Sequence, residues 1–363
     1  MQTIGIIGAG QLGRMMALAG YPLGLRFVFL DKSADTPGGQ VGDIVVGEFD
    51  DPAKLAELAE RVDILTFDFE NVPAGPLAPI AEKMPVWPPA DALETAQDRL
   101  LEKRLFVAQG LATPQFEPVD TLDELKTAVD KIGLPAVLKT RRLGYDGKGQ
   151  RMLREPGDIE SAFNDLGGAP LILEQFIEFD REVSIVGVRS TGGECRFYPL
   201  AHNTHHHGIL HHSIAPYVDA DLQAKAEGHA RTLMQHFGYV GVLTIEFFVK
   251  GGNLIANEIA PRVHNSGHWT IEGAETSQFE NHIRAVADLP LGETGAIGHS
   301  AMVNFLGEMP PLDQVLAIPG AHYHDYGKSP RPGRKLGHCT LRADTREVLD
   351  ERLQQVLAQC MPA

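Results

Sequence analysis

Two glutamates occupy facing positions in a predicted β-hairpin. The segment "TIEFFVKGGNLIANEIA" has two apolar runs on either side of a glycine turn. A turn on residues 251–253 would pair Lys250 with Leu254, and the same register sets Glu246 opposite Glu258. Facing carboxylates repel unless a cation lies between them, and oxygen ligands suit Mg²⁺ held together with phosphates. The pair therefore predicts a divalent-metal site, unless both glutamates lie on a solvated face.

A glycine-rich segment, "KTRRLGYDGKGQ" (residues 139–150), lies between two apolar runs. Its glycines allow close approach of an anion to backbone N–H groups, and cations flank it on both sides. It is not a Walker A loop, because no Gly-Lys-Ser/Thr sequence opens a helix here. We interpret it as a cover for phosphates; the alternative is an ordinary hairpin with Lys139 extended to solvent.

A donor-rich loop, "APRVHNSGHW" (residues 260–269), directly follows the second glutamate strand. It brings Arg262, His264 and Asn265 to the predicted metal site, and such donors suit an oxyanion. Turn or capping roles for Asn265 and Ser266 are the alternative.

A basic segment, "YGKSPRPGRKLGH", places four cations in eight residues of an acidic chain. Its two prolines stiffen the backbone and lower the entropy lost when the cations bind an anion. A solvated run of charges is the alternative.

Six histidines lie in "HNTHHHGILHH" (residues 202–212). Neither a cysteine nor an H-E-x-x-H pattern accompanies them, so a zinc site is disfavoured. We expect a flexible loop over a bound nucleotide, with one or two imidazoles acting as donors.

The N-terminal stretch "GIIGAGQLGRMM" carries a dinucleotide fingerprint. Gly8, Gly10 and Gly13 follow an apolar run, and Asp31 closes the next run, "RFVFLD". An NAD-dependent oxidoreductase is thus a rival interpretation, although it leaves the glutamate pair and both basic loops unexplained.

The elements that must position these residues fall into three parts. Residues 1–98 alternate strand and helix, which predicts a parallel sheet. One charged helix, "ETAQDRLLEKRLFVAQG", begins at the end of the first part and leads into residues 99–290. These residues continue as antiparallel pairs of strands. The expected pairs are "LPAVLKT" with "QRMLRE", "PLILEQFI" with "REVSIVGVR", and the glutamate hairpin. Residues 291–363 predict a small β domain closed by a C-terminal helix.

Composition limits the classes of function. The 363 residues are 43% hydrophobic and 22% charged, typical of a globular protein, and the net charge of −16 disfavours nucleic acid as a partner. No apolar run of about 18 residues could span a bilayer, and no signal peptide is recognisable. Three scattered cysteines favour a reducing compartment, so we expect a cytoplasmic protein with no membrane partner.

The motifs together resemble a known superfamily. The glycine-rich hairpin, the segment "LEQFI", Glu182 and the facing glutamates resemble ATP-grasp enzymes. A closer resemblance, to the 5-(carboxyamino)imidazole ribonucleotide synthase family, covers residues 8–338. It is carried by "GxGQLGRM", "GYDGKGQ", "EVSIVG", "HNTHHHGI", "NEIAPRVHNSGHWT" and "RPGRKLGH".

The resemblance implies a fold and an activity. The fold is α/β and α+β, with a Rossmann-like pre-ATP-grasp domain (1–98), an ATP-grasp domain (99–290) and a small β-rich C-terminal domain (291–363). The activity is that of an ADP-forming carbon–nitrogen ligase of purine (IMP) biosynthesis. ATP, with Mg²⁺, converts bicarbonate to carboxyphosphate, which carboxylates the amine of 5-aminoimidazole ribonucleotide. Family members are homodimers, and transient contact with the downstream mutase is a further expectation.

The resemblance also implies roles for individual residues. ATP would contact Arg99, Lys139, Gly144, Tyr145, Asp146, Gly147, Lys148, Gly149, Gln150, Glu174, Gln175, Phe176, Ile177, Glu182, His205, Asn257 and Glu258. Glu246 and Glu258 would hold Mg²⁺. Catalysis would involve Tyr145, Asp146, Lys148, Arg262, His264, Asn265, Lys328 and Arg331. The ribonucleotide would contact Gln11, Leu12, Glu70, Arg331, Arg334 and Lys335.

The chain departs from the superfamily at one position. Many members have Asn two residues beyond the second metal glutamate, where this chain has Ala260, so the third metal ligand is open. Two further alternatives are a formate-dependent glycinamide ribonucleotide transformylase and a non-enzymatic ATP-sensing module. The resemblance implies that Gln11 and Leu12 of the N-terminal glycine loop face the ribonucleotide. Asp31 would then not bind the ribose of a nicotinamide dinucleotide.

Overall fold

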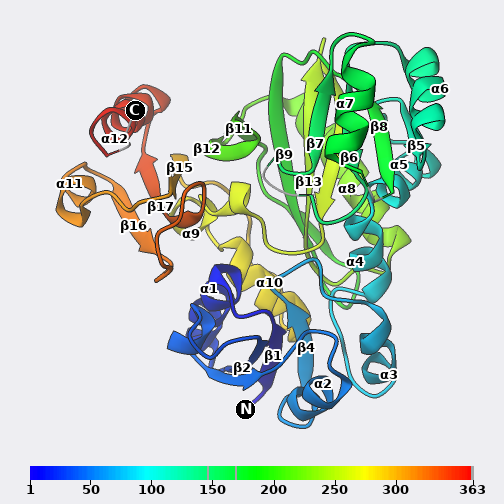
Figure 1. Ribbon diagram of the computed structural model, residues 1–363. Helices are drawn as coiled ribbons and strands as arrows, with labels where there is room; N and C mark the ends of the chain where they lie inside the picture. The colour runs from blue at the N-terminus through cyan, green and yellow to red at the C-terminus, as the bar shows by residue number, and fades with distance from the viewer. Residues whose placement is uncertain (145–146, 168–169, 361–363) are drawn as a thin grey trace.

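The computed structural model describes residues 1–144, 147–167 and 170–360, without the side chains of 359 and 360 (Figure 1). Within these residues the helices are α1 (Gln11–Gly20), α2 (Pro52–Ala59), α3 (Ala78–Ala81), α4 (Ala90–Gln97), α5 (Arg99–Ala108), α6 (Leu122–Ile132), α7 (Asp158–Asp165), α8 (Ala220–His236), α9 (Thr270–Gly273), α10 (Gln278–Val286), α11 (Leu312–Leu316) and α12 (Arg346–Cys360). The strands are β1 (Thr3–Ile7), β2 (Arg26–Asp31), β3 (Asp43–Val46), β4 (Ile64–Phe67), β5 (Phe116–Val119), β6 (Ala136–Thr140), β7 (Gln150–Leu153), β8 (Leu171–Gln175), β9 (Arg181–Arg189), β10 (Cys195–Phe197), β11 (Ala201–His206), β12 (Ile209–Ala215), β13 (Gly241–Lys250), β14 (Asn253–Ala260), β15 (His299–Leu306), β16 (Ala321–Asp325) and β17 (Lys335–Ala343).

The N-terminal sheet is parallel, in the order β3-β2-β1-β4, as the alternation of strands and helices predicts. Helix α10, from far along the chain, lies beside this sheet (Figure 1) and packs on α1. Ile283 of α10 is buried in one cluster with Ile4 and Met16 of the N-terminal part. His282 Nε2 lies 2.8 Å from Thr66 Oγ1 on β4. One face of the first sheet is therefore covered by a helix that we expected, from the sequence, to belong to the central part.

A small antiparallel sheet follows, in the order β5-β8-β6-β7. Helices α6 and α7 pack on it through a buried cluster that includes Leu125, Leu138 and Leu173. The predicted pairing of β6 with β7 is confirmed. The predicted pairing of "PLILEQFI" with "REVSIVGVR" is wrong, because β8 pairs with β5 and β6 whereas β9 pairs with β10, β11 and β13. Two long apolar strands next to each other in sequence thus belong to different sheets.

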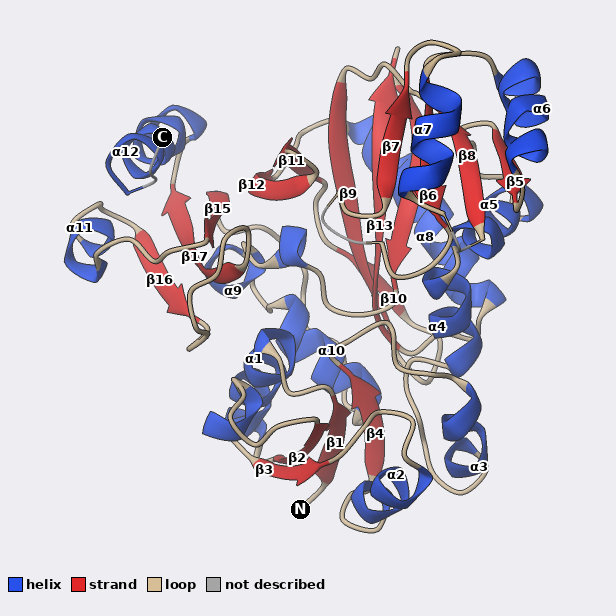
Figure 2. Ribbon diagram, in the orientation of Figure 1, coloured by secondary structure: helices blue, strands red, loops and turns tan. Residues whose placement is uncertain are grey.

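The large sheet runs β14-β13-β9-β11-β12-β15-β17-β16, with β10 added beside β9. The expected C-terminal strands pair with one another, but they do not form a separate sheet, because β15 also pairs antiparallel with β12. Figure 2 shows β11 and β12 between β9 and the C-terminal strands. Helices α11 and α12 pack on these strands, with Val315 and Leu353 in a shared buried cluster.

The expected single helix "ETAQDRLLEKRLFVAQG" is two helices, α4 and α5. Asp98 separates them with an extended backbone, and its carboxylate accepts the N–H groups of Leu100 and Leu101. The same carboxylate forms an ion pair with Arg141 at 2.6 Å, and this pair helps to lower the pKa of Asp98 against the effect of its burial. The break therefore caps α5 and joins it to the glycine-rich segment.

None of the helices in the part of the chain that the structure describes is both long enough and apolar enough to cross a bilayer.

Candidate active site

One large cavity, of about 950 Å³, is lined by strands of the two antiparallel sheets, by the start of α1 and by the loop after β4. It brings together residues that the sequence places hundreds of positions apart. The predicted site residues that line it are Gln11, Leu12, Glu70, Arg99, Lys139, Gly144, Gly147, Lys148, Gln150, Glu174, Gln175, Phe176, Ile177, Glu182, His205, Glu246, Asn257, Glu258, Arg262, His264, Asn265, Lys328, Arg331, Arg334 and Lys335. Gly149 lies beneath it, where its carbonyl accepts the N–H of Thr140. Tyr145 and Asp146 lie outside the described residues.

Glu246 and Glu258 stand opposite each other on β13 and β14, as predicted, but not by the predicted route. Lys250 pairs with Asn253 rather than with Leu254, because the turn uses only Gly251 and Gly252, both with positive φ. A bulge between Glu246 and Phe247 then shifts the register by one residue and restores the glutamate pair. The turn is one residue shorter than predicted, which shifts the strand register by one residue, and the bulge shifts it back.

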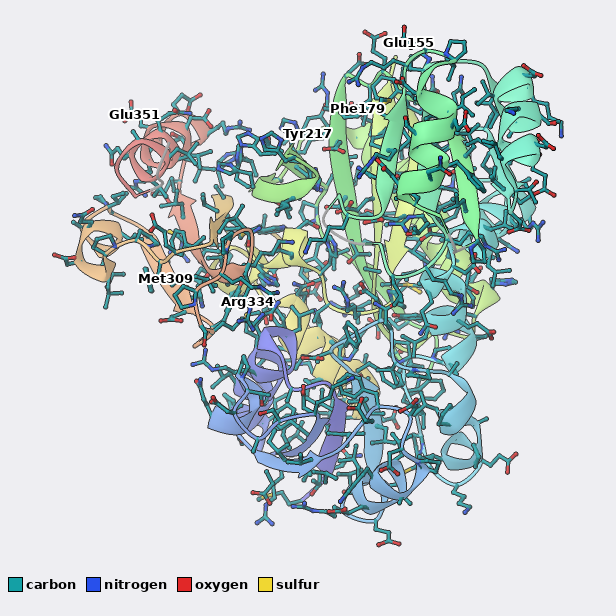
Figure 3. All side chains as sticks on the ribbon, viewed as in Figure 1. Glu155, Phe179, Tyr217, Met309, Arg334 and Glu351 are labelled. Atoms are coloured by element: carbon teal, nitrogen blue, oxygen red, sulfur yellow. The ribbon has the colours of Figure 1, made fainter. Side chains whose placement is uncertain are left out.

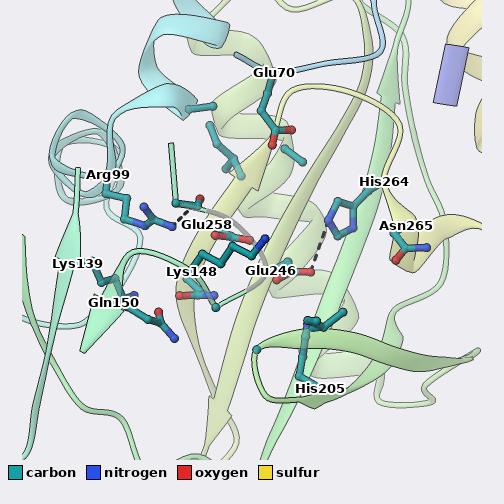
Figure 4. Close-up of a pocket in the computed structure, with 18 of the residues that line it drawn as sticks. Glu70, Arg99, Lys139, Lys148, Gln150, His205, Glu246, Glu258, His264 and Asn265 are labelled. Carbon is teal, nitrogen blue, oxygen red and sulfur yellow. Dashed lines mark hydrogen bonds and ion pairs between the residues drawn. The ribbon is translucent and has the colours of Figure 1, made fainter. Parts of the chain in front are cut away.

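The glutamate pair forms a negative wall of the cavity (Figure 4). Burial and the neighbouring Glu258 raise the pKa of Glu246 to about 7. Two carboxylates so close together fit a divalent cation between them. Among the described residues no cluster of three or more His, Cys, Asp or Glu side chains is arranged to hold a metal ion. A cation bound here would thus have the two glutamates as its carboxylate ligands, and phosphate oxygens of a bound nucleotide are of the same ligand type.

A buried charge network lies behind Lys139. Lys139 Nζ donates to Glu174 Oε2 at 2.9 Å, and Lys103 Nζ lies 3.6 Å from the same oxygen. Burial alone would raise the pKa of Glu174, but the two lysines outweigh it and lower the pKa to about 2. Lys103 also donates to the carbonyl of Asn257, the residue at the β14 bulge. The family resemblance gave Glu174 only as an ATP contact, whereas its side chain holds Lys139 in place.

Arg99 and Glu102 line the cavity from α5. Arg99 donates to the carbonyls of Thr140 and Gly144, so it supports the beginning of the glycine-rich segment. Glu102 is 2% exposed and accepts the N–H of Ile259 at 2.6 Å, next to Glu258. Burial and Glu258 raise its pKa to about 8. Glu102 and Lys103 were missed, although their spacing of three and four residues from Arg99 puts all three on one helix face.

An apolar part of the cavity lies beside the hinge, Glu174–Ile177. It is lined by Val137, Met152, Phe176 and, in parallel rings 4.7 Å apart, Phe179 and Phe248. A flat heterocycle fits such a slot, with the hinge backbone available for hydrogen bonds.

The histidine tract is a β-hairpin, β11 and β12, and not the flexible loop expected. Of its imidazoles, His205 lines the cavity, and its Nδ1 lies 2.5 Å from Glu182 Oε2. Burial lowers the pKa of His205, but the bond to Glu182 and the charge of Glu246 outweigh it, and the net shift is upward. His205 and Glu182 thus form a hydrogen-bonded pair in the lining of the cavity.

The donor-rich loop reaches the cavity from the far side of the glutamates. Arg262 forms an ion pair with Glu70, which joins the central part to the N-terminal part. His264 Nε2 lies 3.7 Å from Glu246 Oε1, and burial together with Arg262 holds the pKa of His264 well below its usual value. Asn265 exchanges two hydrogen bonds with Asn304 on β15, at 2.7 and 3.0 Å. All three side chains line the cavity, and Figure 4 shows His264 and Asn265 beside Glu246.

The basic segment closes the cavity from the C-terminal side. Lys328 Nζ donates to Gln11 Oε1, and burial together with Arg334 lowers the pKa of Lys328 to about 8. Arg334 donates to the carbonyl of Ser329 at 3.0 Å, and Figure 3 shows it on the side of the C-terminal strands that faces the N-terminal part. The four cations of the segment therefore line the cavity; Lys328, Arg334 and Lys335 are half-buried, whereas Arg331 is exposed.

Carboxylates of the protein itself accept hydrogen bonds from the backbone N–H groups of the N-terminal glycine loop. Asp68 Oδ2 accepts the N–H groups of Gly10 (2.6 Å) and Gly13 (3.2 Å), and Asp31 Oδ2 accepts that of Ala9. A dinucleotide would need these same amides for its pyrophosphate. The NAD interpretation is thus disfavoured, and the glycines are explained by the close approach of Asp68.

Comparisons with known proteins agree with this geometry. Residues 1–97 match the family "Ribonucleotide synthetase preATP-grasp domain", 104–279 "ATP-grasp domain", and 300–352 "Phosphoribosylaminoimidazole carboxylase C-terminal domain". The chain is 53% identical over 355 residues to N5-carboxyaminoimidazole ribonucleotide synthase of Pseudomonas aeruginosa, with 98% of both chains covered.

Two solved structures are similar over almost the whole chain. N5-carboxyaminoimidazole ribonucleotide synthetase from Thermus thermophilus has a TM-score of 0.95 at 53% identity, with 99% of both chains covered. The Aspergillus clavatus N5-carboxyaminoimidazole synthase, solved with ADP and 5-aminoimidazole ribonucleotide, has a TM-score of 0.92 at 28% identity, with 98% of both covered. The chain therefore belongs to the N5-carboxyaminoimidazole ribonucleotide synthase family of ATP-grasp ligases.

Proposed function

We propose that the chain carboxylates 5-aminoimidazole ribonucleotide with bicarbonate at the expense of ATP, as a step of de novo purine biosynthesis. The products are 5-(carboxyamino)imidazole ribonucleotide, ADP and phosphate. The observation that carries the proposal is the single cavity shared by the hinge, the glutamate pair, the donor-rich loop and the basic segment. A ligase that joins two substrates while it cleaves a third, ATP, needs such a convergence, because positioning supplies much of the rate.

ATP lies in the apolar slot with its adenine on the hinge backbone. Arg99 and Lys139 contact the phosphates, and the segment from Gly144 to Gln150 folds over them with Lys148. Glu182 binds the ribose and His205 lies beside it. The presence of Val137, Phe179 and Lys139 in the lining of one cavity supports this orientation.

Glu246 and Glu258 would hold Mg²⁺ together with phosphate oxygens of ATP. The facing carboxylates and the raised pKa of Glu246, caused by burial and by Glu258, fit a bound cation. When bound, the ion neutralises charge on the transferring phosphoryl group. Asn257 and Ala260 also line this part of the cavity, and which group completes the coordination is open.

Bicarbonate lies between the phosphates and the donor-rich loop. One of its oxygens attacks the γ-phosphorus, ADP leaves, and carboxyphosphate forms beside Arg262, His264 and Asn265. The amine nitrogen of the ribonucleotide then bonds to the carboxyl carbon, phosphate leaves, and the amine loses a proton. Tyr145, Asp146 and Lys148 complete this region by family resemblance.

The ribonucleotide lies between the N-terminal loop and the basic segment. Gln11, Leu12 and Glu70 contact its sugar and base, and Arg331, Arg334 and Lys335 its 5′-phosphate, while Lys328 and Arg331 assist the carboxyphosphate. The ion pair between Glu70 and Arg262 sets the distance between the two substrates.

A product assay with labelled bicarbonate, ATP and 5-aminoimidazole ribonucleotide tests the proposal. We expect label in the acid-labile product and ADP release that depends on all three substrates. Formate in place of bicarbonate, with glycinamide ribonucleotide, tests the transformylase alternative, and NAD reduction tests the oxidoreductase. Tight ATP binding without turnover when every substrate is present would instead indicate an ATP sensor.

We propose, in addition, a cytoplasmic homodimer whose domains divide near residues 98 and 290 and which contacts the downstream mutase transiently. Family membership supports these proposals. Light scattering of the purified chain measures the dimer, and product transfer in the presence of excess mutase measures the contact.

A further inference from the structure

A buried row of hydrogen-bonded side chains ends on His264. Ser213, Asn203, Ser184 and Ser266 are each at most 3% exposed. Ser213 Oγ donates to Asn203 Oδ1 at 2.8 Å, Asn203 Nδ2 to Ser184 Oγ at 3.0 Å, and Ser184 Oγ to Ser266 Oγ at 2.8 Å. Ser266 Oγ lies 2.8 Å from His264 Nδ1. The row thus leads from the middle of the large sheet to the cavity.

The sheet register explains why the row lies beside the glutamate pair. Asn203 on β11 pairs with Ser213 on β12, and Ser184 on β9 pairs with Glu246 on β13. Directly paired residues point to the same face of a sheet. The polar row and the acidic wall are therefore two parts of one sheet face, and the loop after β14 brings Ser266 and His264 onto it.

The row has a direction. Asn203 Nδ2 donates to Ser184 Oγ, which leaves the Ser184 proton able to point at Ser266 and the Ser266 proton able to point at His264 Nδ1. The backbone N–H of Ser266 also points to Nδ1, at 3.3 Å, and a backbone amide can only donate. A proton on Nδ1 would point toward this amide hydrogen, so the backbone contact favours an unprotonated Nδ1. The ring proton is then placed on Nε2, which faces Glu246 and the cavity.

We infer that Asn203, Ser184 and Ser266 are positioning residues that hold His264 as the Nε2–H tautomer, a fixed hydrogen-bond donor to the anion bound in the cavity. That the anion is bicarbonate or carboxyphosphate rests on the proposed function. An Nε2 that carries a proton cannot accept one from the amine of the second substrate. His264 therefore stabilises negative charge and is not the base of the reaction.

The tautomer can be measured without any substrate. In protein labelled with ¹⁵N-histidine, the couplings between ring nitrogens and carbon-bound protons identify which nitrogen is protonated, and His264→Gln assigns the signal. We expect protonated Nε2 and unprotonated Nδ1 at neutral pH. Protonated Nδ1 with bare Nε2 would overturn the inference. Because this result does not depend on turnover, it is independent of the proposed reaction.

Substitutions separate positioning from folding. Ser266→Ala leaves only the longer backbone contact on Nδ1, so we expect the Nδ1–H tautomer to appear and kcat/KM for bicarbonate to fall about tenfold, with the KM for ATP nearly unchanged. Ser300→Ala is the matched control, because Ser300 is equally buried and its Oγ has no hydrogen-bond partner in the described residues. We expect it to leave both readouts as in the wild type. An unchanged tautomer and unchanged kinetics in Ser266→Ala would contradict a positioning role.

A third comparison tests the donor itself. His264→Gln keeps an N–H donor at the place of Nε2, whereas His264→Asn places its amide nearer to Nδ1. We expect Gln to retain about ten times more activity than Asn, because one well-placed hydrogen bond to an anion is worth about that factor. Equal loss in both variants, with the wild-type fold retained, would favour a base and overturn the assignment.

Discussion

Asp68 accepts the backbone N–H of Gly10 through Oδ2, at 2.6 Å. The contact joins the end of β4 to the first turn of α1, where dinucleotide-binding proteins hold pyrophosphate instead. Burial raises the pKa of Asp68 to about 6, although two backbone donors oppose the shift. A protein carboxylate thus takes the place of a bound anion, and the glycines serve the fold rather than a cofactor.

The first prediction concerns Gly8, which has φ of +95°. A Cβ added there would collide with Asp68 Oδ1. We expect Gly8→Ala to lower the free energy of unfolding by about 3–5 kcal/mol, from backbone strain and overpacking together. Gly24→Ala is the control, because φ is +76° but nothing lies within 4 Å of its Cβ, so only about 1 kcal/mol of strain is expected. Urea denaturation measures both, and equal losses would contradict the packing argument.

The second prediction concerns the glutamate pair. Glu258→Gln keeps the side-chain volume and removes one ligand charge, so Mg²⁺-dependent ADP release should fall about a hundredfold or more while the fold persists. Glu60→Gln makes the same chemical change on an exposed helix end and should leave turnover unchanged. Mg²⁺ titration of the steady-state rate measures both. Near wild-type activity in Glu258→Gln would refute the assignment of the pair to metal.

The third prediction concerns Lys148, which points into the cavity from the glycine-rich segment (Figure 4). Because a covering residue acts mainly once the substrates are enclosed, Lys148→Ala should lower kcat about tenfold or more and change the KM for ATP little. Lys126→Ala, on an exposed face of α6, is the control. Weaker ATP binding at an unchanged rate would count against a role in the chemistry.

The fourth prediction concerns Glu174 and pH. Lys103 and Lys139 outweigh the effect of burial and lower the pKa of Glu174 to about 2 in the folded chain, from 4.5 for a glutamate in water. Its ionised form therefore stabilises the fold above pH 4.5, by about 3 kcal/mol, and this contribution is lost as the pH falls from 4.5 toward 2.

Glu174→Gln tests this contribution. We expect the variant to be about 3 kcal/mol less stable than the wild type at pH 7, with the difference shrinking below pH 4.5. Glu117→Gln is the matched control on the same sheet, because its pair with Lys131 is exposed and contributes less than about 1 kcal/mol. Denaturation curves from pH 3 to pH 7 give both series, and a pH-independent difference would contradict the charge argument.

The sequence predicts the local elements well because they depend on local patterns. The parallel N-terminal sheet follows from alternating strands and helices, and the β6–β7 hairpin from its glycine-rich turn. The glutamate pair was predicted from a turn of the wrong length, and only the bulge next to Glu246 made the result correct. Bulges depend on packing between strands, which a single sequence does not display.

The pairing of strands and the contacts between elements that are distant in sequence were not predictable in the same way. Apolar β8 and β9 are adjacent in sequence and carry no signal that they enter different sheets. The buried network of Lys103 and Glu174 needs α5 and β8 in contact, and only the fold supplies that. By contrast, a polar residue that interrupts a helical pattern, as Asp98 does, is a readable capping signal that the expectation of one helix overlooked.

Helix α10 has a consequence for how this enzyme can be divided. The apolar side of the N-terminal sheet is covered by a helix that follows it by some two hundred residues, and His282 joins β4 to the backbone of Val242 on β13. A fragment ending at residue 97 would leave that side exposed to water, whereas the module described by the family match ends there. The boundary of the family match is therefore not the boundary of a unit that buries its own apolar surface. The first sheet and the central sheet should melt in one cooperative transition.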